Sequence, residues 1–173
     1  LAYGYMTDEF LKIIDTDMGR EVIEDSAGIF GVVRSIFKLL KYIKPLAREM
    51  INDSWEVAKA VMPDLILFHP KILGAVSIAE KLGIPVIMAN LQPMIVPTNQ
   101  FPMAGMPALN IGRWYNKATY GLIKLGLGMY AGIVNDFRQN RLHLPPFPKS
   151  SGMRFTADGK PIPILHGYSP HIV

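Results

Sequence analysis

A histidine and two amide side chains stand where predicted strands end. His69 follows the apolar run at 65–68, and Asn90 and Gln92 close a second apolar run. Ligands of parallel α/β sheets bind at the carboxyl ends of strands, where an imidazole can orient or deprotonate a hydroxyl group and amides can hold hydroxyl groups. We therefore expect His69, the adjacent Pro70, Asn90 and Gln92 to bind a substrate. The alternative is that these side chains bond only to neighbouring loops.

A proline- and methionine-rich segment at 92–112 follows the second apolar run. A loop of this length in a compact domain is usually functional or disordered, and its apolar content argues against disorder. Methionine side chains make a soft wall that adapts to a bulky ligand. We expect Met94, Phe101, Met103 and Met106 to line an acceptor pocket. The alternative is ordinary packing beneath a long loop.

His166 and Ser169 lie at the end of a third predicted strand, at 162–168, and are expected at the edge of the same cleft. The sequence contains no cysteine, no paired-histidine spacing, and no Walker, HExxH or GxSxG motif. We therefore expect neither a metal site nor a bound cofactor.

The elements that position these residues form a strand–helix–strand unit. The run at 65–68 has the composition of a strand buried on both faces. A helical pattern at 72–82 ends at Gly83, and a strand follows at 84–89 with Pro85 at its entry. Short connections make this a parallel unit. A long helical pattern at 113–142 precedes the third strand, so the fold class is α/β with a partial parallel sheet and flanking helices.

Residues 1–62 form a helical segment, and 63–173 contain the sheet, the loop and the long helix. A helical pattern spans 29–60, with a kink or restart expected at Pro45. This pattern carries a basic stripe at steps of three and four residues: Arg34, Lys38, Lys41, Lys44 and Arg48. Such a stripe can lie on an anionic membrane surface. A solvated helix face is the favoured alternative.

The composition limits the class of protein. Half of the 173 residues are apolar and 18% are charged, which excludes a disordered or nucleic-acid-coating protein. The longest uncharged apolar run in a helical context, 125–134, is far shorter than the roughly 20 residues of a membrane span. We expect a cytoplasmic protein, with peripheral membrane contact left open. The chain lacks an initial methionine and ends in an apolar run, so we expect a piece of a longer protein.

Several motifs together resemble the N-terminal domain of UDP-glucose:sterol glucosyltransferases and their bacterial relatives that act on antibiotic aglycones. The resemblance extends over about 49–173. AEKLGIP, at 79–85, is typical of the wider superfamily, whereas the His-Pro corner and the Pro-Thr…Phe-Pro loop are typical of the sterol branch. The residues that carry it are PDLILFHPK at 63–71, IAEKLGIP at 78–85, QPM at 92–94, Pro97-Thr98, Phe101-Pro102, Tyr115-Asn116, Tyr120 and GYSPH at 167–171.

The resemblance implies the GT-B fold, in which two Rossmann-like domains face each other. The N-terminal domain, lacking here its first strands, would bind an apolar alcohol. The absent C-terminal domain would bind the UDP-sugar as a co-substrate, without an essential metal. The reaction would be an inverting hexosyl transfer, and its base is expected before Leu1. No aspartate lies between Asp64 and Glu80, so the aspartate–histidine pair of plant relatives is not supported. The chain alone is expected to be inactive.

Two other functions remain open at the level of the sequence. One is a non-catalytic α/β module that binds a lipid or another small molecule. The other is an unrelated α/β enzyme such as a nucleotide-sugar epimerase, which would need a dinucleotide fingerprint that the sequence does not contain.

Overall fold

A computed structural model describes residues 4, 28–92, 96–103, 106–147 and 159–169; side chains at 28–42 and 123–125 are outside the description. The chain divides into two compact units, Leu1–Met62 and Pro63–Val173. None of the helices in these described ranges is long and apolar enough to cross a lipid bilayer.

The first unit contains the helix α3, Gly28–Val61. Its backbone is continuous through Pro45, so the expected restart does not occur, although proline supplies no N–H to the preceding turn. Ala47, Ile51 and Ala58 are buried on one face. Lys44 and Arg48 of the basic stripe are exposed, and the side chains of Arg34, Lys38 and Lys41 lie outside the described set.

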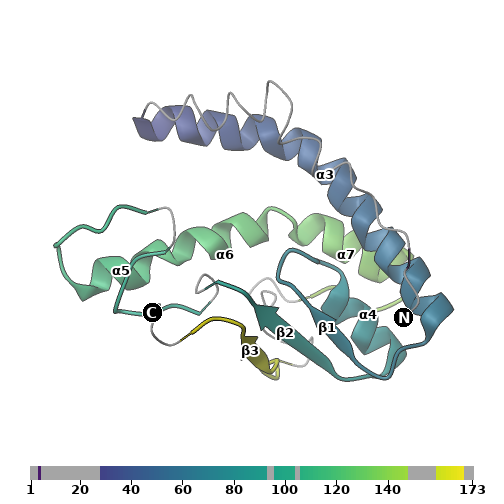
Figure 1. Ribbon diagram of the computed structural model, residues 1–173. Helices are drawn as coiled ribbons and strands as arrows, with labels where there is room; N and C mark the ends of the chain where they lie inside the picture. The colour runs from purple at the N-terminus through teal and green to yellow at the C-terminus, as the bar shows by residue number, and fades with distance from the viewer. Residues whose placement is uncertain (1–3, 5–27, 93–95, 104–105, 148–158, 170–173) are drawn as a thin grey trace. The chain divides into compact units, whose positions relative to one another are not determined.

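The second unit is built on three parallel strands in the order β1-β2-β3: β1 Ile66–Phe68, β2 Val86–Asn90 and β3 Ile164–His166 (Figure 1). Phe68 pairs with Met88, and Met88 pairs with Ile164. The helix α4, Ala75–Leu82, connects β1 to β2. The predicted α/β class, with a partial Rossmann-like parallel sheet and flanking helices, is confirmed.

A buried apolar cluster joins α4 to one face of this sheet. Its members are Phe68, Ala75, Val76, Ala79, Val86, Met88 and Ile162. β2 alternates between buried and half-buried residues, as a strand with one covered face does. The expectation that the 65–68 run is buried on both faces is wrong: Leu65 and Leu67 are 45% and 58% exposed. The reason is geometric, because the cluster with α4 covers only the side to which Phe68 points.

Gly83 ends α4 as predicted, with a φ of 68° in the left-handed region. Its N–H donates to the Glu80 carbonyl, and the Ile84 N–H donates to the Ala79 carbonyl at 3.0 Å. These bonds satisfy carbonyl groups of the last helical turn that would otherwise lack donors. The chain then enters β2 directly.

The helical pattern at 113–142 is three helices: α5 Arg113–Thr119, α6 Gly121–Gly128 and α7 Ala131–Asn140 (Figure 1). A single continuous helix is therefore wrong. α6 begins and ends with glycine, which has a low helix propensity. At its end the Met129 and Tyr130 N–H groups donate to carbonyls three residues earlier, a tighter turn that stops the helix.

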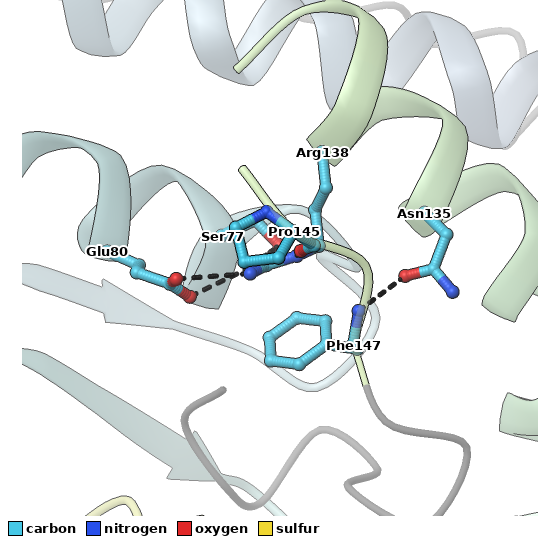
Figure 2. A network of polar contacts seen from close by, with 6 residues as sticks. All are labelled: Ser77, Glu80, Asn135, Arg138, Pro145 and Phe147. Atoms are coloured by element: carbon cyan, nitrogen blue, oxygen red, sulfur yellow. Dashed lines mark hydrogen bonds and ion pairs between the residues drawn. The ribbon is translucent and has the colours of Figure 1, made fainter. Parts of the chain in front are cut away.

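A buried polar network ties α7 to α4, as Figure 2 shows. The Arg138 side chain is fully buried and forms two parallel bonds with the Glu80 carboxylate, at 2.8 and 3.1 Å. Its Nε donates to the Pro145 carbonyl at 2.7 Å, and the guanidinium lies 3.9 Å from the centre of the Phe147 ring. The network fixes the connector at 141–147 against α4, which carries the first four residues of AEKLGIP.

Candidate functional site

The three strands end at one edge of the sheet, called here the carboxyl edge and defined by Phe68, Asn90 and His166. Asn90 and His166 are register partners on neighbouring strands. β1, which precedes His69, is on the other side of β2. Asn90 and His166 thus end neighbouring strands, while a cleft edge at His166 stays a prediction.

His69 is half-buried in the turn that leads from β1 to α4. Its Nδ1 accepts a bond from the Lys71 backbone N–H at 3.3 Å, so the neutral ring carries its proton on Nε2. Burial, and secondarily the positive charge of Lys71, lower the pKa of His69 from 6.5. The neutral ring can donate from Nε2 to a hydroxyl oxygen. Pro70, which follows it, is buried.

Asn90 is the most enclosed of the predicted site residues, at 2% exposure. Its backbone carbonyl accepts a bond from the Gly167 N–H at 2.7 Å, which joins the end of β2 to the segment after β3. Its side-chain oxygen and nitrogen have no hydrogen-bond partner among the described residues. The alternative, in which the Asn90 amide bonds to backbone groups of the loop after β2, therefore does not hold among the described residues. Gln92 is exposed.

His166 pairs with Tyr168 beside β3. The Tyr168 hydroxyl lies 2.6 Å from His166 Nδ1, and the two rings meet edge to face with centroids 5.2 Å apart. His166 and Ser169 are both exposed, which is compatible with the edge position expected of them. The sequence reasoning did not give Tyr168 a role in this pair.

Tyr120 is a second buried polar residue that sequence reasoning noted only as part of the resemblance. It joins α5 to α6, is 4% exposed, and its hydroxyl has no partner in the described portion of the chain. Burial, and secondarily the Tyr168 phenol, raise the pKa of Tyr120 above 10.0. The hydroxyl therefore stays protonated at neutral pH. A tyrosine in an apolar helical pattern gives no sequence signal for this position.

The apolar loop after β2 is tied to α5 by side chains of that helix. The Met103 N–H donates to the Thr119 hydroxyl at 2.8 Å, and the Asn116 amide donates to the Asn99 carbonyl at 3.0 Å. The Tyr115 hydroxyl donates to the Pro107 carbonyl at 3.0 Å. Phe101, Met103 and Met106 are half-buried, and Met94 lies outside the described residues.

The polar groups at the carboxyl edge are thus imidazole, amide and phenol groups, close in sequence to an apolar loop. No cluster of three or more histidine, cysteine or acidic residues that could hold a metal ion occurs among residues 28–92, 96–103, 106–147 and 159–169. Neutral donors and acceptors of this kind can hold a hydroxyl group, and the half-buried methionines can contact an apolar body.

Comparisons with known proteins find similarity to proteins named sterol 3-beta-glucosyltransferase. It is 31% identical over 127 residues to a sterol 3-beta-glucosyltransferase of Glomerella lagenarium, covering 72% of this chain and 8% of that protein. A protein of the same name from Arabidopsis thaliana is 26% identical over 148 residues, covering 79% of this chain and 22% of its own length. One from Neurospora crassa is 30% identical over 127 residues, covering 72% of this chain and 8% of that protein.

No family model matches the sequence. The chain spans less than a quarter of the length of these relatives, since the shares are 8% and 22%. The resemblance read from the His-Pro corner, the AEKLGIP motif and the Pro-Thr…Phe-Pro loop is nevertheless confirmed. The chain is homologous to part of proteins named sterol 3-beta-glucosyltransferase.

Proposed function

We propose that the whole protein transfers a hexose, glucose, from a UDP-sugar to a hydroxyl group of a sterol or another bulky apolar alcohol. In this proposal the chain supplies the acceptor-binding part. The observation that carries it is the 31% identity over 127 residues to a protein named sterol 3-beta-glucosyltransferase. The neutral polar groups at the carboxyl edge and the apolar loop tied to α5 support it.

The acceptor would lie along the carboxyl edge and the loop. Its binding residues would be His69, Pro70, Asn90, Gln92, Met94, Phe101, Met103 and Met106. Since the neutral His69 ring carries its proton on Nε2, its role would be to donate to the acceptor oxygen rather than to remove the proton. His166 and Ser169 would lie nearer to the donor sugar.

The reaction would be a displacement at the anomeric carbon with inversion. The acceptor oxygen forms a bond to that carbon while the bond to the UDP oxygen breaks, and UDP leaves with the bonding electron pair. The hydroxyl proton passes to a base outside this chain. Charge on the leaving diphosphate would be stabilised by the donor domain of the GT-B pair, and no bound cofactor takes part.

The test uses the full-length protein with UDP-glucose and a series of sterols and polyketide alcohols. Product is measured with donor hydrolysis subtracted, and the anomeric configuration is read by NMR. We expect a β-glucoside from the α-linked donor. Absence of transfer to any alcohol would refute the proposal. Tight sterol binding without transfer would instead identify the non-catalytic binding module. The 173-residue chain alone should give no turnover.

Peripheral membrane contact through α3 is a separate part of the proposal. It is supported by the exposure of Lys44 and Arg48, which flank the buried face of Ala47, Ile51 and Ala58. Liposome flotation with and without anionic lipid tests it. Binding should need anionic lipid and weaken with salt, and equal binding to neutral liposomes would contradict the electrostatic mode.

A further inference from the structure

Three buried polar atoms share one unusual property. Asn90 Oδ1, Asn90 Nδ2 and the Tyr120 hydroxyl have no hydrogen-bond partner among the described residues. The two residues are 2% and 4% exposed. Buried polar side-chain atoms are partnered in the large majority of cases, so atoms of this kind need an explanation. A ligand group or an internal water is the usual one.

Both residues are connected with the segment that follows β3. Asn90 ends β2, and its carbonyl accepts the Gly167 N–H at 2.7 Å. The phenol of the next residue, Tyr168, contributes to the raised pKa of Tyr120. Tyr168 also bonds to His166, the register partner of Asn90. The segment after β3 is thus bonded to Asn90 and acts electrostatically on Tyr120.

The chemistry of the pair selects a neutral partner. An amide offers one acceptor and two donors, and a phenol offers one donor and one acceptor. Neither carries a charge at neutral pH, so the pair does not fit a diphosphate or a carboxylate, which prefer charged donors. A hydroxyl group, which both donates and accepts, can satisfy an amide and a phenol at once.

The surroundings favour an apolar alcohol as the source of that hydroxyl. Thr119, the residue before Tyr120, accepts the Met103 N–H at 2.8 Å and donates to the Asn116 carbonyl at 2.6 Å. The half-buried methionine loop is thus anchored directly beside Tyr120. A polar pair adjoining an apolar wall is the arrangement of a site that binds a bulky alcohol by its hydroxyl end.

We propose that Asn90 and Tyr120 together bind the hydroxyl group of the acceptor and select alcohols over the matching hydrocarbons. The inference rests on the proposed function and adds Tyr120, with a stated role, to its acceptor residues. Both are binding residues rather than bases, because the proton of the attacking hydroxyl must leave to a group that can hold it. A hydroxyl of the donor sugar has the same chemistry, and the experiment separates the two sources.

The experiment uses the full-length protein, wild type, Tyr120→Phe and Asn90→Leu, with Tyr130→Phe as the matched control at another tyrosine of the same unit. Dissociation constants are measured for cholesterol and for cholest-5-ene, which lacks the 3-hydroxyl, and KM for cholesterol and UDP-glucose. Tyr120→Phe should weaken cholesterol binding about tenfold, roughly the factor of one hydrogen bond. It should leave cholest-5-ene binding and KM for UDP-glucose unchanged. The control variant Tyr130→Phe should match the wild type in all of these measurements.

Two results would overturn the inference. One is an unchanged preference for cholesterol over cholest-5-ene in both variants. An internal water would then be the hydrogen-bond partner of these atoms. The other is a rise in KM for UDP-glucose alone, which would assign them to the sugar. Melting temperature adds a further check: Tyr120→Phe should melt no lower than wild type, because the hydroxyl has no hydrogen-bond partner to lose among the residues that the structure describes. A clear loss of stability would contradict the inference.

Failure of the proposed function gives a different result. If the wild-type protein binds cholesterol better than cholest-5-ene but transfers no sugar, the proposed function fails. A loss of that preference in Tyr120→Phe would then still support the hydroxyl site. If transfer occurs and both variants leave the preference intact, the proposed function stands and the inference fails.

Discussion

Replacing Arg138 with methionine should destabilise the second unit strongly. The change removes two bonds to the Glu80 carboxylate, one to the Ser77 hydroxyl at 3.2 Å, one to the Pro145 carbonyl and the contact with the Phe147 ring (Figure 2). Methionine keeps most of the apolar volume of the stem. The loss therefore reports on the polar network rather than on an empty space.

The magnitude follows from burial. Removing one partner of a buried ion pair costs about 3 to 5 kcal/mol, because the other charge is left without compensation. The Arg138 side chain is 0% exposed but that of Glu80 is 29% exposed, so the carboxylate regains some hydration. We therefore expect a loss at the lower end, about 3 kcal/mol. Arg113→Met, at an exposed arginine, should cost no more than about 0.5 kcal/mol.

The assay is urea unfolding followed by far-ultraviolet circular dichroism, with Glu80→Leu and the double variant completing a cycle. The double variant should be more stable than Arg138→Met alone, because it removes the unpaired carboxylate together with its partner. A loss below about 1 kcal/mol for Arg138→Met, or a coupling energy near zero, would refute the view that this pair holds α7 to α4.

Three smaller changes test single contacts. Lys71→Gln should raise the lowered pKa of His69 only part of the way toward 6.5 in an NMR titration, because burial of the ring remains. The folded ring binds fewer protons than the unfolded one, so the contribution of this histidine to stability should fall as pH drops below about 6.5. A His69 pKa at or above 6.5 in the wild type would contradict this. Gly83→Ala should cost about 1 kcal/mol in urea unfolding from its left-handed φ alone, since nothing lies within 4 Å of an added Cβ; unchanged stability would be inconsistent with that strain. Thr119→Val should cost about 1 kcal/mol and speed amide exchange at Met103, and equal exchange rates would argue against the anchor.

Local chemistry explains what could be read from the residues. The β1–α4–β2 unit is predicted by three local patterns: the run 65–68, the helix ending at Gly83 and the run 84–89. Each element is specified by its own composition and period. The boundaries shift by a few residues, to Ile66–Phe68, Ala75–Leu82 and Val86–Asn90. The placement of Asn90 beside His166 was not predicted, because local patterns do not give the order of strands in a sheet.

Other features depend on contacts between distant segments. The exposure of Leu67 could not be read from the sequence, because an apolar run looks the same whether one face or two are covered. Arginine in a helical pattern usually indicates a solvent-facing position. Arg138 is buried only because Glu80, 58 residues away, supplies its carboxylate.

The sequence by itself determined the parallel α/β class, the strand ends with His69 and Asn90, and the relation to sterol 3-beta-glucosyltransferases, because these depend on short motifs and local periodicity. Only the tertiary structure decided that one face of β1 is exposed and that Arg138 pairs with Glu80. It also decided that Tyr120 and the Asn90 amide are buried without a hydrogen-bond partner among the described residues. Burial and polar pairing depend on contacts between residues far apart in the sequence, and the local sequence pattern does not indicate these contacts.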